Sequence, residues 1–317
     1  MLKILILSNS HNLIKTANLH SSSLEKLILQ GCSSLVEVHQ SIGNLTSLIF
    51  LNLEGCCSLK ILPENIGNVK SLKTLNISEC SQLEKLPEGM GDMEFLTEVL
   101  ADGIENEQFL SSIGQLKYVR RLSLDGYSLA PPSCSLISAG ISSLKRWLPT
   151  SFTEWRLVKC FELSDSGLSD RATNCVDFSG LSALERLDLS RNNFSSLPSG
   201  IGSLPKLKTL RVDFCDNLVS IPDLPSCLDV LGASHCESLE RVRISMEPKK
   251  YRYFSLYNSN SFEEIQGIEG LSKCFWDLHV DNYNHSLNKL QKNVIEVLFL
   301  SFTIAQEETH TIGTYID

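Results

Sequence analysis

The sequence predicts an α/β solenoid in the form of a horseshoe, with short parallel strands on the concave face and irregular, 3-10 or helical segments on the convex face. The first observation behind this prediction is an internal repeat. Segments that open at Leu24, Leu48 and Leu72 align letter by letter, at two steps of 24 residues. The second observation is the spacing within each segment, LxxLxL followed by Cys at the eighth position after the opening Leu.

A fixed period of about 20 to 29 residues, with LxxLxL and then Cys or Asn, is the signature of a leucine-rich repeat. One such unit cannot bury its own apolar edge, so stacked units share a core and leave a long concave sheet exposed. The pattern therefore indicates a protein that holds a partner.

Segments that meet this template to varying degrees open at Leu2, Leu24, Leu48, Leu72, Leu96, Val119, Val158, Leu184, Leu207 and Leu228. In each, the alternating apolar residues predict a short strand whose Leu side chains enter the core. The Cys or Asn at position eight is expected to satisfy backbone groups of the next turn, Asn with a full amide and Cys with a weak S–H donor. Later Leu-Pro and Ile-Gly pairs mark the return along the convex side, where Gly allows a tight bend.

Position eight is also where many cysteines fall: Cys32, Cys56, Cys80, Cys215 and Cys236. Neighbouring strands stack about 4.8 Å apart. Parallel Cβ vectors would then hold the Cβ atoms about 5 Å apart, whereas a disulfide needs about 3.8 Å. We therefore predict buried free thiols, and with them a reducing compartment.

The repeat rhythm breaks twice. The step from Val119 to Val158 is 39 residues, which predicts an insertion near 127–157. This insertion is either a protruding contact loop or a degenerate repeat that bulges from the convex side. After about Ile244 no LxxLxL recurs, so we predict a solenoid of about ten units at 1–243 and an irregular C-terminal segment at 244–317 with one helix near 286–300.

Both ends of the predicted solenoid lack a polar cap, which stacked repeats need. The first unit opens at Leu2, and the final residues, THTIGTYID, read as a strand without a partner. We expect a fragment of a longer protein or a shortened gene product, in which 244–317 leads into a truncated post-repeat domain.

Composition and motifs argue against other classes of function. The net charge of −9 disfavours nucleic acid, which needs clustered Lys and Arg. The longest apolar run, 294–304, is about half the roughly 20 residues that a membrane span requires. The histidines are scattered, with none at metal-ligand spacing to a Cys pair. We predict no catalytic, cofactor or metal site and no enzyme activity.

The predicted binding surface is the concave face. Residues that flank the LxL leucines, at positions two, four, six and seven after the opening Leu, should face it. The candidate partner-binding residues are Lys26, Phe50, Glu54, Asn76, Glu79, Asp102, Arg121, Asp125, Arg186, Asp188, Arg191, Arg211 and Asp213. The three arginines from Arg186 to Arg211 should lie close together, and a rigid Arg cluster suits carboxylate-rich partner surfaces.

Three consecutive units, at 24–47, 48–71 and 72–95, share the pattern LxxLxLxGCxxLxxLPxxIGxLxxL. This pattern resembles the repeats of plant intracellular immune receptors of the TIR–nucleotide-binding–leucine-rich-repeat family. The run LERLDLSRNNFSSLPSGIGSLPKLKTL, followed by CDNLVSIPDLPSCLDVLGASHCESLE, is similar to the C-terminal repeats of those receptors. The tail GIEGLSKCFWDLHVDNYNH resembles the segment that leads into their post-repeat β-sandwich.

This resemblance implies a recognition module of a disease resistance receptor. Its partners would be a pathogen effector or a guarded host protein, and the receptor's own nucleotide-binding domain, which the repeats hold inactive. The sequence has no GxxxxGK[ST] phosphate loop, so only the recognition and autoinhibition roles carry over. The implied location is the cytoplasm, and also the nucleus, with no nucleic acid, membrane or metal partner.

Two alternatives remain open. The triplets at Asn44, Asn76, Asn193 and Asn284 are glycosylation sequons, which would suit an extracellular receptor ectodomain. A glycan on Asn76 would however block the concave face. The other alternative is a stand-alone truncated decoy.

Overall fold

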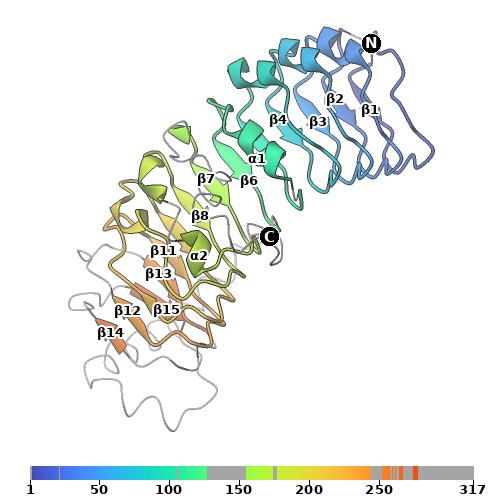
Figure 1. Cartoon of the computed structure of the whole chain (residues 1–317). Coiled ribbons are helices and arrows are strands. Elements are labelled where there is room, and N and C mark those ends of the chain that lie inside the picture. The colour runs from blue at the N-terminus through green and yellow to red at the C-terminus, as the bar shows by residue number, and fades with distance from the viewer. Residues whose placement is uncertain are drawn as a thin grey trace, which may run out of the picture.

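The fold is a single stack of short parallel strands. A computed structural model of the chain describes residues 2–20, 22–104, 106–126, 155–173, 177–243, 252–257, 259, 261, 264–266 and 274–277. Within these residues, one 12-stranded sheet runs in the order β1-β2-β3-β4-β5-β6-β7-β8-β9-β11-β13-β15. Figure 1 shows the strands stacked along an elongated, curved solenoid. The predicted α/β solenoid is therefore confirmed.

Each of the ten predicted openings contributes one strand to this sheet. The strands are β1 (Ile4–Ile6), β2 (Lys26–Ile28), β3 (Phe50–Asn52), β4 (Thr74–Asn76), β5 (Glu98–Leu100), β6 (Arg121–Ser123), β7 (Cys160–Glu162), β8 (Arg186–Asp188), β9 (Thr209–Arg211) and β11 (Val230–Gly232). The pairing register keeps equivalent positions side by side, as in Leu27 beside Leu51 and Leu51 beside Leu75.

The core lies directly behind the middle residue of each strand. Leu51, Leu75 and Leu210 are fully buried, and their neighbours on the other side of the coil join them in one continuous cluster. Burial of one such side chain stabilises the fold by about 1.5 to 3 kcal/mol. The 24-residue spacing therefore places apolar side chains in register from unit to unit.

Position eight forms a ladder of polar contacts inside the coil. The thiols of Cys32, Cys56 and Cys80 donate to the carbonyl oxygens of Leu7, Leu29 and Leu53 in the preceding unit, at 3.1, 3.2 and 3.2 Å. Two further thiols in the C-terminal units make equivalent bonds. The predicted role of this position, to satisfy buried backbone groups, is confirmed.

On the convex side, the N-terminal units carry 3-10 segments: η1 (Gln40–Asn44), η2 (Glu64–Asn68) and η3 (Glu88–Asp92). The Ile-Gly pair of each unit lies in these segments. A Cβ on Gly67 would lie 2.8 Å from backbone atoms of Gly89, and a Cβ on Gly43 would lie 2.6 Å from the Asn65 carbonyl oxygen. These glycines therefore serve close stacking of neighbouring units, and the predicted tight bend is not their main role.

Other convex segments are α1 (Glu107–Ile113), α2 (Asp170–Thr173), η6 (Phe178–Gly180) and η7 (Ile201–Ser203). The last units replace helical turns by a second, 3-stranded parallel sheet of β10 (Ser220–Ile221), β12 (Arg241–Arg243) and β14 (Glu264–Gln266). Across the residues that the structure describes, no helix is both long and apolar enough to cross a membrane.

The main sheet continues past residue 243, where the sequence predicted that the repeats end. Strand β13 (Arg252–Ser255) pairs with β11, and β15 (Cys274–Asp277) pairs with β13. The spacing survives here with different residues, because Phe254 and Leu256 fill the two strand positions and Ser259 takes position eight. The helix predicted near 286–300 lies outside the described residues.

The insertion predicted near 127–157 falls between neighbouring strands. Strand β6 pairs directly with β7, with Arg121 beside Cys160, so the sheet is not interrupted. Most of the insertion lies outside the described residues. At its end, Trp155 is buried and packs edge-on against Phe161, with ring centroids 5.5 Å apart. This tryptophan therefore belongs to the core.

Candidate functional site: the concave face

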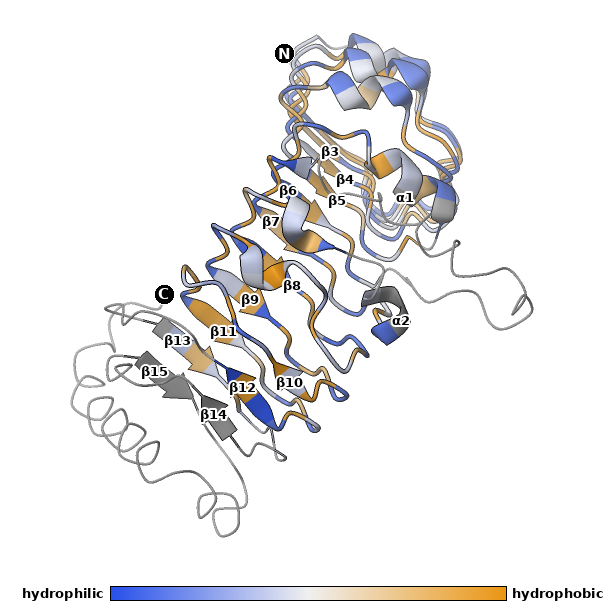
Figure 2. Ribbon diagram, turned by 60° about the vertical axis from the view of Figure 1, so that its left-hand side comes forward, coloured by the Kyte–Doolittle hydropathy of each residue, from blue (hydrophilic) through white to orange (hydrophobic). Residues whose placement is uncertain are grey.

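The concave face is the side of the 12-stranded sheet that points away from the core. The first and third residues of each strand, at positions two and four, point to this side, and the turn after each strand adds positions six and seven. In strands such as β8, an apolar middle residue lies between two charged ones, and Figure 2 shows hydrophilic and hydrophobic segments side by side along the solenoid. The face is thus a set of parallel rows, each running from unit to unit.

The middle of the face is rich in carboxylates. Between β5 and β9 it carries Glu98, Asp102, Asp125, Glu162, Asp188 and Asp213, against the three arginines Arg121, Arg186 and Arg211. The acid excess lies before β8, whereas the units of β8 and β9 carry Arg186, Arg191 and Arg211 against Asp188 and Asp213. The excess of acid arises because positions four and six carry Asp or Glu in several consecutive units.

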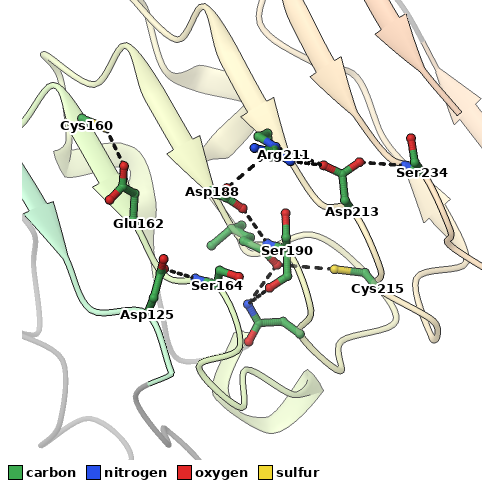
Figure 3. A network of polar contacts seen from close by, with 12 residues as sticks. Asp125, Cys160, Glu162, Ser164, Asp188, Ser190, Arg211, Asp213, Cys215 and Ser234 are labelled. Carbon is green, nitrogen blue, oxygen red and sulfur yellow. Dashed lines mark hydrogen bonds and ion pairs between the residues drawn. The ribbon is translucent and has the colours of Figure 1, made fainter. Parts of the chain in front are cut away.

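Several of these carboxylates bind the protein's own backbone. Asp102 accepts hydrogen bonds through Oδ1 from the Ser123 hydroxyl and from the Asp125 N–H. Asp125 accepts from the Ser164 N–H at 2.6 Å, and Asp213 accepts from the Ser234 N–H at 2.9 Å. Figure 3 shows the last two contacts within a network that spans several strands. In these three units, position six therefore links one turn to the next.

Two of the arginines are neutralised within the face. Arg121 lies between Glu98 and Glu162, at 3.1 and 3.3 Å. Arg211 pairs with Asp213 at 3.0 Å and lies 3.8 Å from Asp188 (Figure 3). These two guanidinium groups are therefore already paired with carboxylates of the face.

The carboxyl group of Asp125 has an unusually high pKa. Its pKa is raised from 3.8 to about 6, first because it is partly buried and then because Asp102, Glu162 and Asp188 place negative charge nearby. The hydrogen bond from Ser164 opposes this shift. A carboxyl group held between like charges gains a proton more easily than one in water.

The turn after each strand adopts one conformation throughout. Position seven has a positive φ in all ten units, from Asn9 at 58° to His235 at 57°. Four units place glycine there, which suits this left-handed region. Others place Glu79, Asp165, Arg191, Phe214 and His235 there. A large side chain in this region costs on the order of 1 kcal/mol.

The three consecutive turns at Arg191, Phe214 and His235 stack their side chains. The Arg191 Cζ atom lies 4.6 Å from the Phe214 ring centroid. The Phe214 and His235 rings are parallel within 2°, at 4.6 Å, and His235 meets Tyr257 edge-on at 5.3 Å. We call these four residues the turn ladder.

The structure divides the predicted site residues by exposure. Lys26, Glu79, Arg121, Arg186, Arg191 and Arg211 are exposed; Phe50, Glu54, Asp102, Asp125 and Asp188 are half-buried; Asn76 and Asp213 are buried. Asn76 accepts from the Ser78 N–H and donates to Glu54, so its amide is used within the fold.

Sequence reasoning missed Glu98, Glu162, Phe214, His235 and Tyr257. The signal for the first four was their position, since each occupies position two, four or seven of its unit. Tyr257 was missed because its unit has aromatic residues in place of the leucines of the template.

The thiols of the described cysteines form no disulfide. Burial raises the pKa of the thiols of Cys56, Cys215 and Cys236 to about 12 and raises that of Cys80 as well. These side chains are therefore unreactive thiols at neutral pH. Within the described part of the chain, no group of three His, Cys, Asp or Glu residues is arranged to hold a metal ion.

The sequons differ in their surroundings. Asn44 and Asn193 are exposed, whereas Asn76 is 9% exposed and hydrogen-bonded. A glycan at Asn76 would require this side chain to leave its site. Asn284 lies outside the described residues.

Comparisons with known proteins agree with this architecture. The model of the Leucine Rich Repeat family matches residues 183–204. A probable disease resistance protein of Arabidopsis thaliana is 34% identical over 97 residues, which is 29% of this chain and 6% of that protein. The TMV resistance protein N of Nicotiana glutinosa is 35% identical over 88 residues, 28% of this chain and 7% of that protein. The matched region is thus a small part of each relative's length.

A solved structure shows the same fold. The Toll–Spatzle complex, from Drosophila, aligns over 82% of this chain and 36% of that chain, with a TM-score of 0.56 and 15% sequence identity. The resemblance that the sequence predicted is confirmed by the named relatives. The chain is a leucine-rich-repeat solenoid whose repeats are similar to those of plant disease resistance proteins.

Proposed function

We propose that this chain is a non-catalytic protein-recognition module of a plant disease resistance receptor. Its concave face would bind a pathogen effector or a guarded host protein and would restrain the receptor's nucleotide-binding domain. The observation that carries the proposal is the concave face itself, a rigid sheet that exposes charged side chains in register. The similarity to the plant disease resistance proteins named above supports a role in plant defence.

The chemistry of this face favours protein ligands. Rows of Arg, Asp and Glu at the fixed spacing of parallel strands offer complementary charge to a second folded surface and fix its orientation. The acid excess around Asp125 and Glu162 suits basic groups on a partner. Apolar side chains such as Phe50 and Tyr253 lie in the same rows and could anchor it.

We also propose a reducing compartment, the cytoplasm with the nucleus, as the site of action. The supporting observation is a ladder of buried thiols that donate hydrogen bonds to backbone carbonyls in adjacent units. A cysteine in a disulfide has no S–H group and could not make that donation.

The test is co-immunoprecipitation from leaf tissue of the chain with a co-expressed nucleotide-binding domain of a disease resistance receptor. Charge reversal by Arg121→Glu and Arg186→Glu on the concave face should weaken capture. Lys60→Glu is the matched control, because Lys60 is also exposed but lies outside the face. Equal capture by all variants would contradict the proposed role of the face.

A second arm addresses recognition. Co-expression with a panel of pathogen effectors should identify one whose capture is lost in the same concave variants and kept in Lys60→Glu. Capture that depends equally on all three positions would indicate a non-specific charge effect.

A further inference from the structure

The turn ladder combines two exposed side chains, Arg191 and Phe214, with the half-buried His235 and Tyr257, and the core does not require it. Position seven needs no side chain, since Gly31, Gly55, Gly103 and Gly126 occupy it elsewhere. The C-terminal units nevertheless place large side chains there despite the left-handed backbone. Strain of this kind, retained at the surface, is commonly associated with binding.

The exposed rim of the ladder is electropositive. Arg191 is exposed and Phe214 is 41% exposed. The stacked guanidinium keeps its in-plane N–H donors free of the ring face, so they can still bind a carboxylate bidentately. The edges of aromatic rings also carry positive partial charge. The ladder thus presents donors and positive edges beside apolar ring surface.

Arg191 differs from Arg121 and Arg211 in its surroundings. Those two side chains bind carboxylates of the concave face. Over the described ranges of the chain, Arg191 forms no salt bridge. Its guanidinium group lies over the Phe214 ring, with Cζ 4.6 Å from the ring centroid. The residue at the same position one unit earlier is Asp165, which is exposed and forms no ion pair with Arg191 within those ranges.

We propose that the turn ladder is a docking subsite for an acidic segment of a protein partner that also carries an apolar side chain. A carboxylate of the segment would bind Arg191, and the apolar side chain would lie across the edges of the Phe214 and His235 rings. This inference deepens the proposed function, since it names one subsite at the rim of the concave face and the chemistry of its ligand.

The test uses the full chain and three dye-labelled peptides of equal length. One alternates Glu with Leu and Phe, one replaces each Glu by Lys, and one replaces each Leu and Phe by Ser. Fluorescence anisotropy should detect binding of the first peptide only, at concentrations on the order of 100 μM. Preference for the Lys peptide, or no binding of the Glu peptide up to about 1 mM, would overturn the proposal.

Glycine substitutions isolate the side chains, because glycine suits the positive φ of these turns. Arg191→Gly and Phe214→Gly should each weaken binding of the acidic peptide by about tenfold. Asn9→Gly is the matched control, since it changes position seven in the same backbone conformation in the first unit, away from the ladder, and its affinity should stay within about twofold. Asp165→Gly should tighten binding, because it removes a like charge next to the subsite.

The unfolding temperature of every variant is measured in parallel. If Phe214→Gly unfolds below the temperature of the binding assay, Phe214→Asn replaces it, because Asn tolerates this backbone region and occupies it at Asn9. Unchanged affinity in folded Phe214 and Arg191 variants would refute the subsite.

The proposed function would not be refuted by that result if Arg121→Glu weakened capture of the nucleotide-binding domain as expected. Loss of binding in the ladder variants alone, with normal capture by the Arg121 variant, would support the subsite and count against the wider face.

Discussion

The N-terminal units, residues 24–95, and the C-terminal units, residues 184–243, share one core and differ in what surrounds it. In both, the middle residue of each strand is a buried Leu that stacks on the equivalent Leu of the next unit. The N-terminal units close on the convex side with 3-10 turns, whereas the last units form a second sheet there.

The turns after the strands differ even more. Gly31, Gly55 and Glu79 hold position seven in the N-terminal units, whereas Arg191, Phe214 and His235 hold it in the C-terminal ones. The backbone is the same in both cases, with φ between 57° and 72°. Because the core fixes only the backbone there, the side chain is free to vary. Variation at such a position can change recognition without changing the fold.

The largest expected effect tests whether the two regions depend equally on the core. Leu51→Asp in the first region and Leu210→Asp in the second each bury a carboxylate without a partner, which costs several kcal/mol. This cost approaches the whole stability of a typical domain, about 5 to 15 kcal/mol. We expect neighbouring units to unfold in both variants, as measured by circular dichroism and hydrogen exchange.

The control is Lys26→Asp, which places the same side chain on the exposed side of the adjacent strand. Its melting temperature should stay close to that of the unchanged protein. A comparable loss in Lys26→Asp and Leu51→Asp would refute the assignment of the two sides of the sheet.

An intermediate effect separates the two kinds of residue at position eight. The buried Asn192 amide donates to the carbonyl oxygens of Leu163 and Leu189, at 2.8 and 2.9 Å, and accepts from the N–H groups of Ser166 and Leu168. Removing it leaves several buried backbone groups unsatisfied, at about 1 to 3 kcal/mol for each group.

Cys56 makes one weak S–H bond, to the Leu29 carbonyl oxygen. We expect Asn192→Ala to lower the free energy of unfolding by at least about 2 kcal/mol and Cys56→Ala by about 1 kcal/mol. Urea denaturation followed by fluorescence measures both. Equal losses would show that the thiol contributes as much as the amide.

The sequence predicted the repeat positions correctly because the core imposes them. Every predicted opening yields a strand in register, including those separated by the 39-residue step from Val119 to Val158. The LxxLxL spacing within a repeat is enough to identify the residues that the core buries. It also identified position eight, since an interior turn must satisfy its own backbone.

Pairing between side chains could not be predicted in the same way. Arg211 contacts Asp213 from its own unit and Asp188 from the preceding one. Those contacts depend on rotamers and on charges in adjacent rows, which no repeat template contains. The boundary at 243 was placed too early because Phe254 and Leu256 keep the spacing without the LxxLxL letters.

A third effect depends on pH and concerns the carboxylates that lie between the two regions. The pKa of Asp125 is about 6 in the folded chain against an ordinary value of 3.8, so the folded state binds this proton more tightly than the unfolded state. The resulting stabilisation is fully present below about pH 4 and is lost as the pH rises through about 6. Asn at this position still accepts the Ser164 N–H and does not titrate.

The free energy of unfolding of Asp125→Asn, minus that of the unchanged protein, should therefore increase from pH 4 to pH 7. Chemical denaturation at one-unit pH intervals measures this difference. Asp102→Asn removes one of the charges that raise the pKa of Asp125, so it should move the same transition to lower pH. Parallel stability curves for the unchanged protein and Asp125→Asn would mean that this carboxyl group is solvated as well in the folded chain as in the unfolded one. The acidic centre of the concave face would then remain charged throughout this pH range, and its attraction for basic partner groups would not depend on pH.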